Sequence, residues 1–521
     1  MSSLLRSNIT VAAGTAMSRV TGLLRLMVFG WILGQTALSD VYLIANETPN
    51  IVYDLLLGGV LSATLVPLFS SFIETDDDEA TSVVITIAAT LMVALTLIAV
   101  VAAPIIIRLY TLNPGQGVDP AVLRQAGTTL ARIFLIQILF YGLTGLANAF
   151  LNSRRKFFAA AWSPVVANLI TIAALLTLHG TEWGITDVET NSRLTWTLGL
   201  GATVGIAAMA VLTVGSAIRS GLRFRPLWNW KHPAVKQLLK LSAWTLGFVA
   251  ANQIALIVIR NLAEPGSSIA TAYFVAFTFF VLPHGLLAVS ISTTFQPEMA
   301  RAVLRRDRRG FVDQTSLGIR MIALLTLPAG LAMFVLRRPI VGALLEYQKF
   351  SAEAADNTAR ALAGFSLGLV GFSVYLFVLR AFYAHRDTKT PFVINVIENL
   401  INIALAVALV GKFGVLGLGL AYAIAYVLAA VLALRVLSNK VRGFRIKPIA
   451  EASWRMLVAG VLMAEAIWLV TRLFGGDQGA GAFARLIGGS VVGAIVYVSV
   501  LLALRAPELD KLRGMSSRRR D

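Results

Sequence analysis

Cysteine is absent from the 521-residue chain, so disulfides, thiolate metal sites and cysteine nucleophiles are excluded. Charged residues are scarce, at 14% of the chain, and they form no long hydrophilic block. No attached soluble domain is therefore expected, and the lack of strand-like alternation argues against a membrane β-barrel. The four histidines lie far apart in the sequence, and no glycine-rich loop with a lysine is present. The chain therefore shows no catalytic constellation and no direct use of ATP, which favours a transporter over an enzyme.

Apolar residues dominate the composition of the chain. They make up 57% of the chain, and the mean hydropathy is +0.76. At about 20 residues a span, the apolar runs and short connections predict an all-α membrane protein with about fourteen helices. The predicted spans are 9–33, 39–72, 81–109, 122–151, 159–179, 195–218, 235–262, 269–300, 316–336, 355–384, 391–410, 414–437, 452–473 and 482–504.

The net charge of +18 is distributed by topology. Connections after even-numbered spans are basic, such as 152–157, 301–310 and 435–448, except for the acidic one at 74–80. The connections after odd-numbered spans are short or acidic. The positive-inside rule therefore places both termini in the cytoplasm, with Arg337 and Arg338 as exceptions on the outer side. The basic loops predict contact with anionic membrane lipids, and no nucleic-acid partner is expected.

The chain repeats itself once. The segment 168–173 returns as 399–404, and the segment 42–45 returns as 273–276, both at an offset of 231 residues. Six spans make one repeat, so both copies have the same orientation, as in transporters that rock two halves around a central site. We expect an N-lobe at 1–220, a C-lobe at 221–440, two extra spans at 441–505 and a basic cytoplasmic tail at 506–521.

Unusual charges concentrate in residues 17–68, an apolar stretch predicted to form a helical hairpin. These charged residues are Arg19, Arg25, Asp40, Glu47 and Asp54. A charge at membrane depth costs about 2.5–3.5 kcal/mol, so such residues face a watery cavity or one another. The three acidic residues are spaced seven apart and form one stripe on a helix.

Antiparallel pairing of this hairpin places Arg25 beside Glu47, and Arg19 beside Tyr53 and Asp54. We interpret the hairpin as lining a polar cavity that faces its repeat counterpart at about 243–300. The alternative is that the charges are intramembrane ion pairs that hold two helices in register. An arginine in such a cavity suits an anionic or phosphate-bearing group.

A second polar group lies in the C-lobe. Asn395, Glu398 and Asn399 share one side of a helix, and Asn252 lies inside the seventh span. Together they are candidates for an oxygen-rich cation site, and the alternative is a buried cluster that joins helices. No metal cofactor is expected, and transport would run on the membrane potential, an Na⁺ or H⁺ gradient, or the substrate gradient.

The chain resembles the MurJ/MviN family of lipid II flippases, within the superfamily that also contains MATE-type multidrug exporters. The resemblance covers about residues 5–440. It depends on SRVTGLLR at 18–25, TPN at 48–50, GGVLSATLVP at 58–67, LPHGLLAVSISTTFQPEMAR at 282–301, LEYQKF at 345–350 and RAFYAHRDTKTP at 380–391.

The resemblance implies that the chain flips lipid II, the undecaprenyl-pyrophosphate-linked peptidoglycan precursor, across the bacterial cytoplasmic membrane for cell-wall synthesis. It implies a groove for the polyprenyl tail at the last two spans. It also implies roles for Arg19, Arg25 and Asp40. The chain departs from the family at Tyr53 and Thr278, where the family often has arginine, and at Glu47, where the family has a basic residue. Together with Asn50 and Asp54, these are the expected substrate-binding residues.

Two other functions fit the sequence. One is export of another lipid-linked glycan or of cationic drugs, which the acidic stripe would suit. The other is a non-transporting scaffold whose basic loops recruit cell-wall synthesis proteins. A monomer is expected.

Overall fold

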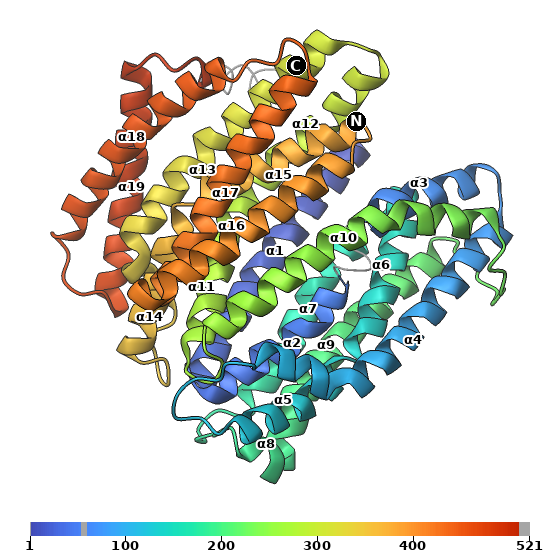
Figure 1. Cartoon of the computed structure of the whole chain (residues 1–521), viewed down its shortest axis with the longest axis horizontal. Helices are drawn as coiled ribbons and strands as arrows, with labels where there is room; N and C mark the ends of the chain where they lie inside the picture. Colours follow the sequence, from blue (N-terminus) through green and yellow to red (C-terminus); the bar gives the residue numbers. More distant parts are fainter. Residues whose placement is uncertain (1, 54–59, 510–521) are drawn as a thin grey trace. The chain divides into compact units, whose positions relative to one another are not determined.

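The computed structural model describes residues 2–53 and 60–509, and these residues are helical apart from short connections (Figure 1). Two compact units make up the chain, residues 1–271 and residues 272–521. The first unit contains α1 Ser2–Leu33, α2 Ala37–Tyr53, α3 Val60–Glu74, α4 Asp78–Tyr110, α5 Pro120–Phe134, α6 Gln137–Ser153, α7 Phe158–Leu176, α8 Asp187–Thr190, α9 Ser192–Arg219 and α10 Pro233–Leu262.

The helix α11, Ile269–Pro283, starts at the end of the first unit and continues into the second. The second unit also contains the π-helix η2 His284–Ala288 and the helices α12 Val289–Leu304, α13 Arg308–Leu344, α14 Ala352–Ser366, α15 Leu369–Ala384, α16 Lys389–Phe413, α17 Val415–Lys440, α18 Lys447–Thr471 and α19 Gly479–Ala503. As far as their residues are described, the predicted spans fall on single helices or on consecutive helices, so the all-α prediction is confirmed.

The count of fourteen spans is not confirmed. Within the described residues, eleven helices are long and apolar enough to cross a membrane, and α14 with α15 makes a twelfth candidate that is bent by 49°. The predicted span at 235–262 contains a shorter apolar helix, Gly247–Leu262, and the predicted span at 39–72 includes residues 54–59, which lie outside the described residues. Length and hydropathy alone did not separate straight spans from broken ones.

Several helices begin at side chains that accept a hydrogen bond from the first turn. Asp77, Asp119, Asn191, Asp307 and Ser351 cap α4, α5, α9, α13 and α14 in this way. Such caps satisfy N–H groups that have no partner within the helix. Pro283 is followed directly by the π-helix η2, and a π-turn of this kind locally widens the helix.

Small residues bring helices into contact in both units. A Cβ atom on Gly364 would lie 2.7 Å from the backbone of Gly419, and one on Gly205 would lie 2.8 Å from the carbonyl oxygen of Ala167. Close backbone contact of this kind drives association of membrane helices, because lipid tails are as apolar as the side chains. Helices α14 and α17 in the second unit, and α7 and α9 in the first, pack in this manner.

The repeated segments occupy corresponding helices. Asn168 lies in α7 and Asn399 in α16, and each of these helices packs against the next long helix along the chain. The lobe boundary expected at residue 220 stays a prediction. In the structure, α10 packs against α3 and α4 and belongs to the first compact unit.

Candidate functional site: buried charges in the first unit

Asp40, in the first turn of α2, is fully buried and accepts hydrogen bonds from the α10–α11 connection. Its Oδ2 accepts from the backbone N–H groups of Gly266 (2.8 Å) and Ser268 (3.1 Å). Its Oδ1 accepts from the Thr271 N–H (2.7 Å) and from the Thr271 hydroxyl. Four donors on one carboxylate compensate for its removal from water. Asp40 therefore holds the connection and the first turn of α11 against α2.

Glu47 lies two turns further along α2 and forms an ion pair with Arg260, near the end of α10. Their side chains are 28% and 9% exposed, respectively, and the Arg260 guanidinium also lies over the Tyr110 ring at 4.7 Å. The pairing predicted between Glu47 and Arg25 is therefore wrong. Hairpin geometry considered partners within residues 17–68 alone, whereas the arginine comes from a helix more than 200 residues away.

The end of α10 is also fixed to the end of α4. The Asn261 Oδ1 accepts from the N–H groups of Leu112 (2.6 Å) and Asn113 (3.0 Å), and its Nδ2 donates to the Leu109 carbonyl (2.8 Å). Gly115 N–H donates to the Pro265 carbonyl at 2.9 Å. The heptad spacing correctly predicted one acidic side of α2, since Asp40 and Glu47 both contact residues 260–271. Asp54 lies outside the described residues.

Arg19 and Arg25 lie on α1, which packs mainly against α7. Asn168 of α7 donates through Nδ2 to the Thr21 hydroxyl (3.0 Å) and to the Ser18 carbonyl (3.3 Å). Arg19 is exposed, whereas Arg25 is half-buried and lies close enough to Tyr42 to act on it electrostatically. Within the described part of the chain, neither arginine forms an ion pair with a carboxylate.

The remaining predicted residues of the first unit are less constrained. Asn50 is half-buried on α2, and Tyr53 is the last residue of that helix, although its side chain is outside the description. The pairing predicted between Arg19 and residues 53–54 accordingly stays a prediction. Asn252 is half-buried within α10, in the first unit.

The second unit contains the other three members of the predicted cation site on α16. Asn395, Glu398 and Asn399 are all buried, and Asn402 extends the same side of the helix. Glu398 is 1% exposed and neither of its oxygens accepts a hydrogen bond from a described residue. Tyr375, Tyr422 and Tyr426 lie near enough to interact with it electrostatically. The polar cluster that the spacing predicted is thus present, with tyrosines that the sequence analysis did not include.

Thr278, the last predicted residue, lies on α11 and donates to the carbonyl of Phe274 in its own helix at 3.1 Å. Among the residues described, no group of three or more His, Asp or Glu side chains is arranged to hold a metal ion.

Sequence analysis did not assign Arg260, Gly266, Ser268 and Thr271 to the site. The signal for Arg260 was present, because it is an arginine within an apolar stretch that faces a stripe of carboxylates. The backbone donors of the connection carried no such signal, because any residue provides an N–H group.

Comparison with known proteins defines the family. The family model "Lipid II flippase MurJ" matches residues 29–488. A "probable lipid II flippase MurJ" of Rhizobium meliloti (strain 1021) is 27% identical, over 98% of this chain and 96% of the relative. Another, of Vibrio cholerae serotype O1, is also 27% identical, over 96% of each chain.

Solved structures show the same fold. "Lipid II flippase MurJ, inward closed conformation" superposes with a TM-score of 0.77 at 24% identity, covering 95% of this chain and 99% of that one. An inward-facing multidrug resistance MATE family transporter of the MOP superfamily superposes with a TM-score of 0.66 at 14% identity, covering 81% of this chain and 95% of that one. The resemblance inferred from the motifs is confirmed, because the family model covers most of the sequence: the chain belongs to the MurJ family of lipid II flippases.

Proposed function

We propose that this chain flips lipid II from the inner to the outer leaflet of the bacterial cytoplasmic membrane by alternating access, for peptidoglycan synthesis. The match of the MurJ family model to residues 29–488 carries the proposal. The ion pair of Glu47 and the hydrogen bonds to the buried Asp40 support it, since charges within an apolar chain are retained for function.

Arg19 and Arg25 are the residues proposed to bind the pyrophosphate of the substrate. A guanidinium stays charged in a membrane cavity and offers paired donors that fit phosphate oxygens. Both lie on one helix, without a carboxylate partner among the described residues. We assign supporting contacts with the substrate to Asn50, Tyr53, Asp54 and Thr278.

Asp40 and Glu47 have a different proposed role, which is to hold the α10–α11 connection in one of the two alternating states. All four acceptor contacts of Asp40 and the ion pair of Glu47 are made with residues 260–271. Alternating access requires such contacts to break and re-form, and a cluster of charge-assisted hydrogen bonds is a two-state element of that kind.

The same contacts disfavour the export of cationic drugs. A carboxylate that already binds Arg260 or four hydrogen-bond donors has little capacity for a cationic ligand. The acidic stripe was the sequence feature that suited drug export, and its two described members are committed within the protein.

We further propose that Glu398 carries the coupling ion, with Asn395 and Asn399 as candidate ligands. A buried carboxyl group whose oxygens accept no hydrogen bond from described residues favours binding a proton or Na⁺. Occupancy of this site would then follow the ion gradient. The proposal includes cytoplasmic termini, a monomer, and contact with anionic lipids and cell-wall synthesis proteins.

The decisive experiment is the rescue of a bacterium depleted of its own lipid II flippase, scored by lipid II reaching the outer leaflet. The wild-type chain should rescue, and Arg19→Ala or Arg25→Ala should abolish rescue at unchanged membrane abundance. Arg193→Ala, which removes an exposed arginine bonded to the Thr177 carbonyl, is the matched control and should rescue. Rescue by Arg19→Ala and Arg25→Ala at wild-type level would favour a scaffold and refute the transport site.

A further inference from the structure

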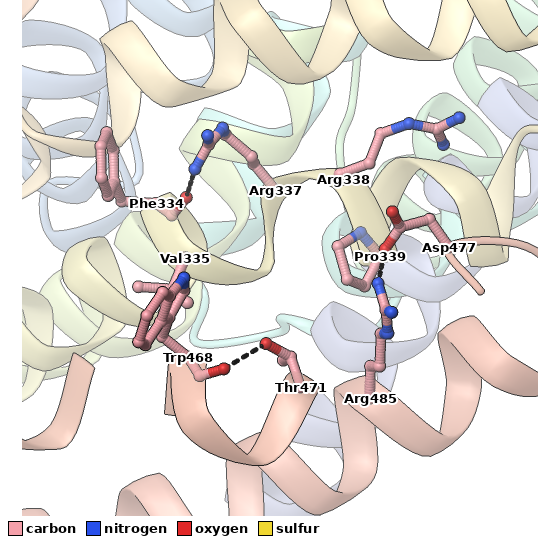
Figure 2. Close-up of a pocket in the computed structure, with 9 residues that line it drawn as sticks. All are labelled: Phe334, Val335, Arg337, Arg338, Pro339, Trp468, Thr471, Asp477 and Arg485. Carbon is pink, nitrogen blue, oxygen red and sulfur yellow. Dashed lines mark hydrogen bonds and ion pairs between the residues drawn. The ribbon is translucent and has the colours of Figure 1, made fainter. Parts of the chain in front are cut away.

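A cavity of about 370 Å³ lies in the second unit, among the ends of α13, α18 and α19. Its size falls within the range of roughly 300–1,000 Å³ that is typical of small-ligand pockets. Figure 2 shows Arg337 on one side and Trp468, Thr471 and Arg485 on the other. The remaining lining residues are Phe334, Val335, Arg338, Pro339 and Asp477.

These arginines are the exceptions to the topology of the chain. Helices α13, α18 and α19 pack against one another, and the basic connections at 301–310 and 435–448 lie at their opposite ends. The positive-inside rule predicts that arginines without a specific structural or binding role lie in cytoplasmic loops. Arginines gathered around a cavity at the other end therefore require a local explanation.

Two of the three lining arginines are already paired. Arg338 donates to Glu346 (2.5 Å) and Asp356 (2.6 Å), and Arg485 donates to Asp477 and to the Phe474 carbonyl. Asp477 is the one carboxylate among the nine lining residues. These pairs fix the walls of the cavity, and Glu346 and Asp356 lie outside its lining.

Arg337 differs from both. It is half-buried, its Nη1 donates to the carbonyl of Phe334 in its own helix at 2.5 Å, and its guanidinium lies 4.9 Å from the Phe334 ring. Within the described part of the chain, Arg337 forms no ion pair, and the lining residues themselves comprise three arginines and one carboxylate. A guanidinium has five N–H donors, and an oxyanion accepts two of them side by side.

The surroundings are those of a lipid headgroup. Trp468 lines the cavity and is exposed, and the neighbouring Leu469 and Leu473 are exposed as well. Tryptophan is enriched at the level of lipid headgroups, where its ring is apolar and its N–H is polar. Gly342 permits this arrangement, because a Cβ there would overlap the carbonyl oxygen of Asp477 and displace the wall of the cavity.

We propose that this cavity binds the phosphate group of an anionic phospholipid, with Arg337 as the principal ligand and the acyl chains along the exposed side of α18. The site is separate from the proposed transport residues, and its test requires no transport. Lipid bound here would brace α13 against α18 and α19.

Binding to the purified full-length chain in neutral detergent tests the proposal, with dioctanoyl phosphatidylglycerol as the probe and calorimetry as the readout. Arg337→Gln should weaken binding about tenfold or more, since it removes the charge and the paired donors. Lys412→Gln is the matched control, because Lys412 is exposed at the far end of α16, does not line the cavity and carries the same charge. It should bind like the parent.

Arg337→Lys keeps the charge and the apolar stem, and it guards against a folding defect in the glutamine variant. It should bind several-fold more weakly than the parent, because a lysine cannot offer paired donors. Equal affinity of the parent, Arg337→Gln and Arg337→Lys would overturn the proposal. Equally tight, Arg337-dependent binding of dioctanoyl phosphatidylcholine would overturn the anionic assignment, and Arg337-dependent binding of inorganic phosphate without binding of the lipid would overturn the lipid assignment.

Discussion

Replacing Asp40 by asparagine should free the α10–α11 connection while leaving the shape of the side chain almost unchanged. Each carboxylate oxygen of Asp40 serves two donors: Gly266 and Ser268 on one side, and the backbone and hydroxyl of Thr271 on the other. An asparagine has one acceptor oxygen and an NH₂ group. Whichever way it is oriented, its NH₂ group faces at least one backbone N–H that has lost its acceptor.

The size of the effect follows from these contacts. Two hydrogen bonds to a charged acceptor contribute about 3–6 kcal/mol together. Burial of a carboxylate at 0% exposure opposes this by several kcal/mol, and the neutral asparagine avoids that penalty. The net cost of local opening should therefore fall by about 2–3 kcal/mol, which corresponds to roughly 30- to 150-fold faster exchange of the amides that Asp40 protects.

Hydrogen–deuterium exchange with peptides covering 264–272 measures this directly. Asp307→Asn is the matched control, because Asp307 caps α13 at an exposed position and asparagine caps a helix equally well. It should leave exchange at 264–272 unchanged. Equal exchange in Asp40→Asn and the parent would mean that the connection is held by packing, and the proposed role of Asp40 as a holding contact would be refuted.

Three further predictions concern other contacts. Glu47→Gln and Arg260→Gln should each lower the free energy of unfolding by about 1–3 kcal/mol, because each leaves one buried charge without its partner. The double variant should lose less than the sum of the two, and additive shifts in thermal unfolding would contradict the ion pair. Glu398→Gln should fold normally but make flipping in vesicles insensitive to the coupling-ion gradient, whereas a structural glutamate would leave that dependence intact. Burial acts to raise the pKa of Asp387, but hydrogen bonds from Lys440 and Thr390 outweigh it and lower the pKa. The stabilisation from Asp387 is therefore present above its ordinary pKa and lost as pH falls through the lower folded-state value, so Asp387→Asn should flatten the acid limb of the unfolding profile.

Features that depend on local sequence were predictable. The apolar runs predicted the helices, and the turn residues between the runs predicted approximately where each helix ends. The heptad spacing of Asp40 and Glu47 correctly placed both residues on one side of α2. The structure also explains part of the motif at 380–391 by local hydrogen bonds. Its Asp387 accepts from Thr390 two ways and from Lys440 at 2.7 Å, which joins the α15–α16 turn to the end of α17.

Partners across long separations were not predictable in the same way. The hairpin register assigned Arg25 to Glu47, whereas the structure pairs Glu47 with Arg260. Next to the turn, the rings of Phe29 and Tyr42 lie 5.1 Å apart, as an antiparallel hairpin requires. Near the turn, chain connectivity limits the possible neighbours. Two turns further along, any apolar helix that carries an arginine can supply the partner. The sequence alone gives no reason to choose Arg260 over Arg25 as the ion-pair partner of Glu47.

Contacts made by backbone N–H groups are harder still to predict from the sequence. Asp40 is held by three N–H groups whose presence in the sequence is uninformative, since almost every residue has one. The sequence does show where burial of a charge is costly. A carboxylate within an apolar stretch loses free energy of hydration, so it must bind hydrogen-bond donors or a cation elsewhere in the protein. The same reasoning applied to cations leads to Arg337, whose charge has no carboxylate partner among the described residues. An arginine far from the basic connections and without a carboxylate partner among the described residues thus predicts an external anion, and the cavity beside Arg337 is the site that we propose for it.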